Sequence, residues 1–180
     1  MFKGISRGLF SVVAFAAIAG CNSTDVNGLK PTGDQAQTAQ PAVIQGACPQ
    51  VYLRDGTASL DKYANGGKGD PSKIVYQASI AATTRQCTLG QNSMTVTVVA
   101  QGRLVGGPLG KPGKIVLPIR VAATDGETTL YSELTNFEVE LPATMTTQFI
   151  FTKADVTIPG GAGNLAKIYV GFDEGPYKTK

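Results

Sequence analysis

No histidine occurs in this 180-residue chain. Histidine is the side chain most often used as a general base, and it is the commonest nitrogen ligand for metals. Its absence excludes a Ser-His-Asp triad, a Cys-His site and histidine-based iron or copper sites within this chain. Enzymes that use paired carboxylates or a Ser-Lys pair remain possible. We predict no catalytic residue, no metal and no dissociable cofactor.

Long apolar runs are missing as well. The uncharged stretch at residues 8–20 has 13 residues, whereas a helix needs ~20 apolar residues to cross a bilayer core. Lys3 and Arg7 precede this stretch, and the small pair Ala19-Gly20 ends it. A basic start, a short apolar run and small residues form the layout of a secretory signal peptide. We therefore predict a cleaved signal peptide over residues 1–20.

The tetrapeptide Ile18-Ala19-Gly20-Cys21 resembles the lipobox of bacterial lipoproteins. The resemblance implies that Cys21 carries a diacylglyceryl thioether and becomes the first residue of the mature chain. Such a lipid anchors a protein to a membrane without a spanning helix. Asn22 stands where retention in the inner membrane often requires Asp, which favours the periplasmic face of the outer membrane. The alternatives are a bacterial cell surface, or an ordinary signal peptide in which Cys21 is incidental.

Charge is sparse throughout the chain. The sequence has 16 basic and 13 acidic side chains, and loss of residues 1–20 leaves 14 and 13, a net charge of +1. There is no cluster of Lys and Arg with interleaved aromatic residues of the kind that nucleic-acid surfaces use. We predict the membrane, through the lipid, and another envelope protein or polymer as partners, and no nucleic acid.

The three cysteines fit an exported protein. With Cys21 assigned to the lipid, Cys48 and Cys87 remain as a pair in an oxidising compartment, which predicts one disulfide. Two buried free thiols are the alternative. Because Cys48 precedes the first predicted strand and tryptophan is absent, we expect this bridge to tie the first strand to a neighbouring turn.

The mature chain divides into a polar segment and a strand-rich segment. Residues 21–46 are rich in Gln, Thr, Gly, Pro and Ala, with almost no large apolar residue before Val43, which predicts a flexible tether. From Cys48 onward, apolar and polar residues alternate with a period of two, as in half-buried antiparallel strands. The predicted strands are 49–54, 73–83, 93–104, 114–123, 128–141, 147–157 and 166–173.

Seven such strands in one domain, residues 47–175, predict an all-β antiparallel sandwich that resembles immunoglobulin and fibronectin type III domains. A short tail follows at 176–180. Pro118 lies inside a predicted strand, which suggests an edge strand or a bulge there because proline lacks a ladder donor. We also expect a bulge or break near Thr135-Asn136.

Three loops carry residues typical of binding sites. The segment 161–166 matches a dinucleotide fingerprint by letters, but a strand follows it where that site needs a helix, so we predict a Gly-rich hairpin. The loop at 106–114 lacks two residues of a phosphate loop; we predict a hairpin whose Lys111 and Lys114 contact an anionic envelope polymer or a protein partner. The long connection 54–73 carries the remaining candidate partner-binding residues: Asp55, Asp61, Tyr63 and Asp70.

A solvated crossover is the alternative for the connection 54–73, and its aspartates do not follow the calcium-binding spacing of an EF-hand loop. Taken together, these patterns predict a lipid-anchored envelope protein with a non-catalytic binding, structural or assembly role. The alternative is a periplasmic or surface protein that uses carboxylates for catalysis or carries a small ligand in a pocket between its sheets.

Overall fold

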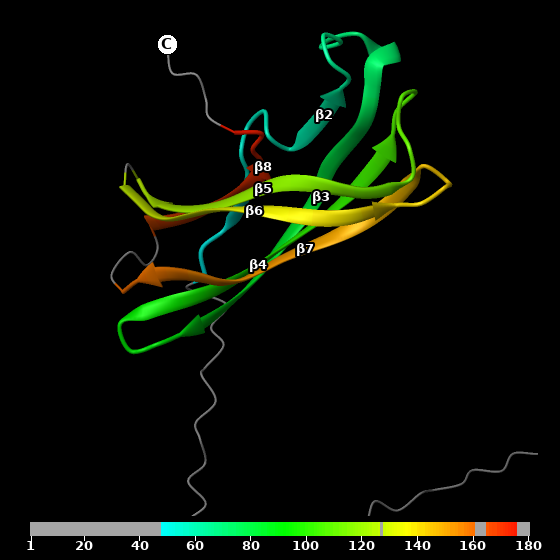
Figure 1. The fold of residues 1–180 in the computed structure, drawn as a ribbon. Coiled ribbons are helices and arrows are strands. Elements are labelled where there is room, and N and C mark those ends of the chain that lie inside the picture. The colour runs from blue at the N-terminus through cyan, green and yellow to red at the C-terminus, as the bar shows by residue number, and fades with distance from the viewer. Residues whose placement is uncertain (1–47, 127, 161–164, 176–180) are drawn as a thin grey trace, which may run out of the picture. The chain divides into compact units, whose positions relative to one another are not determined.

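The computed structural model describes residues 48–126, 128–160 and 165–175 (Figure 1). The predicted signal peptide at 1–20, the tether at 21–46, the lipid site at Cys21 and the tail at 176–180 lie outside the described residues. Within the described part of the chain, no helix has the length and apolarity needed to cross a membrane.

The described residues form two four-stranded sheets, in the orders β1-β8-β5-β6 and β2-β3-β4-β7. Every strand pair is antiparallel except β1–β8, which is parallel. The prediction of an all-β protein with two sheets is confirmed. The elements are β1 (Val51–Leu53), β2 (Ser59–Tyr63), the 3-10 helix η1 (Pro71–Lys73), β3 (Ile74–Leu89), β4 (Ser93–Gly106), β5 (Gly113–Asp125), β6 (Thr128–Leu141), β7 (Thr146–Pro159) and β8 (Ala166–Phe172).

The prediction of seven antiparallel strands was wrong in strand count and in one pairing. The strand that was not predicted is β2. It lies inside the segment expected to be a loop and pairs with the first half of β3. Its sequence has one core residue, Leu60, at 5% exposure, between exposed polar neighbours. A single buried position gives no alternation to detect. Likewise, nothing in β1 distinguishes a parallel from an antiparallel neighbour.

One hydrophobic core lies between the two sheets, built from alternate residues of both. The alternation expected in the strands is confirmed at 94–100 and 117–121, where every second residue is buried and its neighbours are more exposed, while Ile115 is half-buried. Burial of this kind stabilises by about 25 cal/mol per Å² of apolar surface. The largest fully buried side chains are Phe151, Leu104, Leu117, Ile119, Leu141, Ile158 and Ile168.

A β-bulge in β3 changes which residues face the core. The pairing with β4 shifts between Ile80 and Ala82, so Ala81 is the extra residue. Before the shift, even-numbered residues such as Ile80 are buried; after it, odd-numbered residues turn inward and Cys87 is 1% exposed. Ala82, which an unbroken alternation would turn inward with Ile80, is exposed instead, because an inserted residue moves the remaining side chains to the opposite face.

The predicted disulfide joins Cys48 to Cys87, with their Cα atoms 5.6 Å apart. The expectation that this bridge would reach a turn was wrong, because β3 continues to Leu89 and Cys87 lies within that strand. Since Cys48 leads into β1 of one sheet and β3 belongs to the other, the bridge connects the two sheets at one side of the domain.

Two loops expected to be hairpins are crossovers instead. The connection from β4 to β5 contains Lys111, and the connection from β7 to β8 contains the Gly-rich segment; each joins strands of different sheets. Residues 161–164 of the second loop lie outside the described residues. As predicted, a strand rather than a helix follows this segment.

Pro118 lies in β5, which has neighbours on both sides, so the edge-strand expectation was wrong. Pairing with β8 ends at Ile119, and beyond that point the Pro118 carbonyl accepts a hydrogen bond from the Asp173 amide at 2.9 Å. Proline is tolerated there because the regular ladder has already ended.

The expected break near Thr135 is absent from β6; the register shift lies opposite Ala123 and Thr124.

Loss of the disulfide is expected to lower the free energy of unfolding by ~2–4 kcal/mol, since closing a loop with a separation of 39 residues restricts the unfolded chain. The double variant Cys48→Ser/Cys87→Ser, measured by urea denaturation of the full chain, tests this. Cys21→Ser is the control, because it also replaces a cysteine by serine and leaves the bridge intact. Equal stability of the double variant and the control would contradict the expectation.

Candidate functional site

The acidic residues predicted from the 54–73 connection do not meet in one place. Asp61 and Tyr63 lie on β2, and the Asp61 carboxylate accepts a hydrogen bond from Gln77 Nε2 at 2.9 Å. Asp70 caps η1, where its Oδ1 accepts from the Ser72 amide at 3.0 Å. Across residues 48–126, 128–160 and 165–175, no three His, Cys, Asp or Glu side chains are grouped to hold a metal ion.

The two predicted lysines lie at the end of the domain where β3 begins. Gly107 and Leu109, in the loop that contains Lys111, donate backbone hydrogen bonds to Val75 and Ile74 at 2.8 and 3.0 Å. The loop before β3 reaches the same place, so the structure brings the 64–73 and 107–112 loops together. Lys114 is exposed and forms an ion pair with Glu138 at 3.3 Å.

Asp55 lies elsewhere, beside a group of side chains on the outer surface of the β1-β8-β5-β6 sheet. We call this group the tyrosine face and define it as Tyr52, Arg54, Lys167 and Tyr169. These residues, with Leu53 and Asp55, line an open depression of about 420 Å³. The volume is within the ~300–1,000 Å³ range of ligand sites in proteins.

The parallel pairing of β1 with β8 creates the tyrosine face. Tyr52 lies directly opposite Tyr169, and their ring centroids are 5.9 Å apart with a 36° angle between the ring planes. On the other side of β8, Tyr169 pairs with Ala122, whose small side chain leaves the ring uncrowded. Lys167, two residues before Tyr169, projects from the same face because side chains alternate along a strand.

The turn after β1 is fixed by backbone hydrogen bonds. The Arg54 amide donates to the Val170 carbonyl at 3.2 Å, and the Arg54 carbonyl accepts from the Thr57 amide and hydroxyl at 3.0 and 2.8 Å. Thr57 then lies against Gly171, where an added Cβ would stand 1.9 Å from its Oγ1. Only glycine at position 171 leaves room for this turn against the sheet.

A buried carboxylate supports the edge of the tyrosine face. Asp173 is 7% exposed and accepts a hydrogen bond from Arg120 Nε, while Arg120 Nη1 donates to Ser132 Oγ at 3.0 Å. The Arg120 hydrogen bond holds the pKa of Asp173 below its ordinary value, against the opposing effect of burial; the Arg54 charge adds to the lowering. Asp173 therefore stays ionised and offsets part of the local positive charge.

The sequence signal for this site lies in the strands and not in the loops. Tyr52 and Tyr169 occupy outward positions between inward apolar residues, which is an unusual place for two aromatic side chains unless they contact something. Their proximity could not be predicted, because 117 positions separate residues 52 and 169. No sequence pattern marks Arg120 and Asp173 as neighbours of this site.

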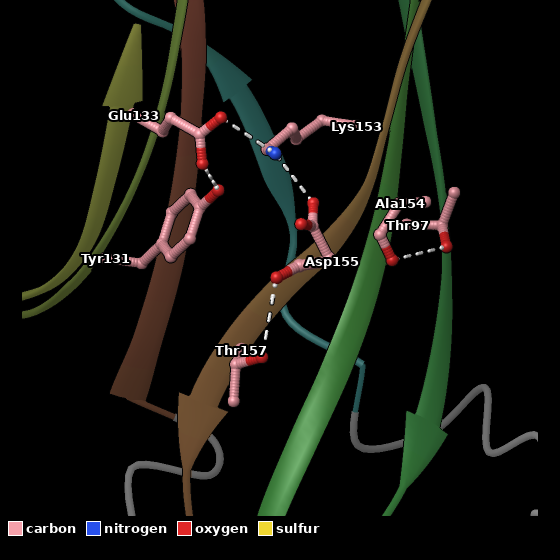
Figure 2. A network of polar contacts seen from close by, with 7 residues as sticks. All are labelled: Thr97, Tyr131, Glu133, Lys153, Ala154, Asp155 and Thr157. Atoms are coloured by element: carbon pink, nitrogen blue, oxygen red, sulfur yellow. Dashed lines mark hydrogen bonds and ion pairs between the residues drawn. The ribbon is translucent and has the colours of Figure 1, made fainter.

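A second polar cluster lies where the edge strands of the two sheets, β6 and β7, meet (Figure 2). Lys153 has a side chain 13% exposed, and its ammonium contacts Glu133 Oε1 at 2.9 Å and Asp155 Oδ1 at 2.7 Å. The Tyr131 hydroxyl donates to Glu133 Oε2 at 2.7 Å. Since Glu133 comes from one sheet and Lys153 from the other, this cluster links the sheet edges.

A bulge in β7 lies within this cluster. The pairing with β4 shifts between Val96 and Val98, so Ala154 and Asp155 both lie opposite Thr97. Thr97 Oγ1 donates to the Ala154 carbonyl at 3.2 Å, as Figure 2 shows. The extra residue changes the inward positions of β7 from odd-numbered to even-numbered residues, so Val156 and Ile158 are buried after it.

The protonation states of this cluster favour a structural role. Hydrogen bonds from Asp155 and Glu133 raise the pKa of Lys153, so it remains charged and cannot serve as a base near neutral pH. The pKa of Glu133 is lowered, first by the Tyr131 hydrogen bond, and that of Asp155 is lowered by Lys153.

No protein-family model, curated protein sequence or solved structure matches this chain.

The Tyr131–Lys153 cluster predicts loss of stability at high pH. Burial and the Glu133 hydrogen bond raise the pKa of Tyr131 from 10.0 to about 12, and Lys153 also keeps its proton above its usual 10.5. The folded state thus binds protons that the unfolded state loses above pH ~10, and the free energy of unfolding falls from there upward. Tyr131→Phe should show a smaller fall in melting temperature between pH 10 and 12 than the unaltered protein.

Circular dichroism melting curves at several pH values measure this slope. Tyr52→Phe, which alters an exposed tyrosine outside the cluster, is the control and should behave as the unaltered protein. The interpretation fails if Tyr131→Phe and the unaltered protein lose stability with the same slope.

Proposed function

We propose that this chain is a lipid-anchored protein of the bacterial envelope whose β-domain binds another envelope component without catalysis. The lipobox at Cys21 supports the anchor, and Asn22 favours the periplasmic face of the outer membrane. The observation that carries the binding role is the tyrosine face, in which two aromatic rings and two cations surround an open depression on a rigid sheet.

The polar chemistry of the domain supports binding over catalysis. An enzyme based on paired carboxylates needs one of them protonated near neutral pH to act as a general acid. Glu133 and Asp155 are two carboxylates that share one ammonium, and both have lowered pKa values. Asp173 is likewise held ionised by Arg120. These three groups are suited to holding charges in place rather than to transferring protons.

We also propose that the domain resembles immunoglobulin and fibronectin type III domains in its two-layer architecture. Without the short parallel strand β1, it has one sheet of four strands and one of three, as an immunoglobulin constant domain does. The order β2-β3-β4-β7 nevertheless differs from the ABED order of that family, so the resemblance is one of layers and size rather than of strand connections.

A tether at 21–46 would give the domain freedom relative to its lipid. A flexible chain of this length has a root-mean-square extension of roughly 25–30 Å. The disulfide fixes Cys48 to β3, so the tether would end at a residue held in place by the domain. The tyrosine face could then reach components a short distance from the membrane.

The anchor is tested by Cys21→Ser in the full chain. The unaltered protein should sediment with membranes, and the variant should move to the soluble periplasmic fraction, because a lipid contributes ~0.8 kcal/mol per buried CH₂. Cys48→Ser/Cys87→Ser is the control, since it replaces the two bridged cysteines and keeps the lipid site. Membrane association of Cys21→Ser equal to the unaltered protein would contradict the proposed anchor.

The binding role is tested by photocrosslinking in living cells. A photoreactive side chain at position 52 should give a crosslinked product with an envelope component, because this position borders the depression. Position 150 is the control: Ile150 is 62% exposed and lies on β7 of the other sheet. Equal products from both positions, or none from position 52, would argue against binding at the tyrosine face.

A further inference from the structure

We infer that the tyrosine face binds an acidic saccharide, a sugar unit that carries a carboxylate or a phosphate. This inference rests on the proposed binding role and names the class of its ligand. It requires three things of the surface: a cation for the acidic group, an aromatic surface for the sugar ring, and a fixed geometry. Each can be traced to particular residues.

Lys167 supplies the cation. It is exposed on β8 and forms no ion pair with any described residue, in contrast to Lys62, Lys114 and Lys153. Arg54 borders the same depression and adds positive potential there, although it also acts on Asp173. Asp55 is the one acidic residue of the lining, so the lining as a whole carries a charge of +1 and favours an anion.

The tyrosine pair supplies the aromatic surface. The C–H groups of a sugar ring carry partial positive charge and pack against the negative face of an aromatic ring. With centroids 5.9 Å apart and planes tilted by 36°, the two rings of Tyr52 and Tyr169 form a shallow, angled platform. Tyr52 is 44% exposed, which leaves its ring available to a ligand. The phenol hydroxyls can donate to or accept from sugar hydroxyls.

The strands hold this geometry without a ligand. Tyr52 and Tyr169 are in register in a hydrogen-bonded pair, and the Arg54 backbone is bonded on both sides, to Val170 and to Thr57. A site that is already ordered loses little conformational entropy on binding, which favours weakly interacting ligands such as sugars. Because the depression is open rather than enclosed, an internal unit of a polymer can lie across it.

Other partners fit the same surface less well. A nucleic acid needs several cations along its backbone, and the tyrosine face has two. A tightly bound protein needs a contiguous apolar core in the interface. The other exposed apolar residues of this sheet, Val116 and Leu134, lie on β5 and β6, separated from β1 by β8.

Affinity electrophoresis of the purified full chain in detergent tests the inference. Polygalacturonate tests a carboxylated saccharide and phosphomannan a phosphorylated one, so these two gels distinguish the sources of the acidic group. Retardation in at least one of them is expected, with none in neutral dextran. Tyr52→Ala and Lys167→Gln should each raise the dissociation constant about fivefold or more, as truncation of a central contact does.

The matched control is Lys68→Gln, which removes the same charge from an exposed position in the loop between β2 and β3. It should bind as the unaltered protein, and melting curves should show that all variants fold. Equal weakening by Lys68→Gln and Lys167→Gln would show that binding is general charge attraction and would overturn the inference. Equal retardation of the unaltered protein and Tyr52→Ala in dextran sulfate would do the same.

Failure of the ligand class and failure of the binding role give different results. If no acidic saccharide retards the protein but position 52 still crosslinks to an envelope protein, the saccharide inference is overturned and the binding role stands. If neither saccharide binding nor crosslinking occurs, both proposals fail.

Discussion

The alternation of side chains along each strand is the constraint on which the rest of this domain depends. Two sheets can share a core only if each strand turns its apolar residues the same way, and one inserted residue reverses that direction. Bulges in β3 and β7 use this reversal. The first turns Cys87 toward Cys48, and the second turns Val156 and Ile158 toward the core.

Contacts between the two sheets join the sides of the sandwich. On one side, the disulfide joins Cys48, which precedes β1, to β3, and an exposed ion pair joins Lys62 of β2 to Glu174, which follows β8. On the other, Lys153 connects β7 to Glu133 of β6. Inward-facing charges and bulges at edge strands also discourage pairing with other chains. The charged groups at this side hold the edges of the two sheets together.

The candidate binding surface follows from a different feature, the parallel pair β1–β8. It brings together residues from the two ends of the domain, and the sheet holds them facing outward. The loops chosen from sequence have local signals, such as glycine and aspartate, which mark turns as readily as sites. Asp70 shows this, since its carboxylate caps a short helix. Asp55 was the one predicted loop residue that borders the tyrosine face.

The sequence alone determined the all-β class, most strand positions, the core residues of β4 and β5 and the pairing of Cys48 with Cys87, because alternation and cysteine count are local or arithmetical properties. Only the tertiary structure decided the strand order, the extra strand β2, the bulges and the meeting of Tyr52 with Tyr169. Those features depend on which strands become neighbours, and that choice comes from packing two whole sheets around one core. A single sequence records the apolar residues available for that packing, but not the partner that each strand finds.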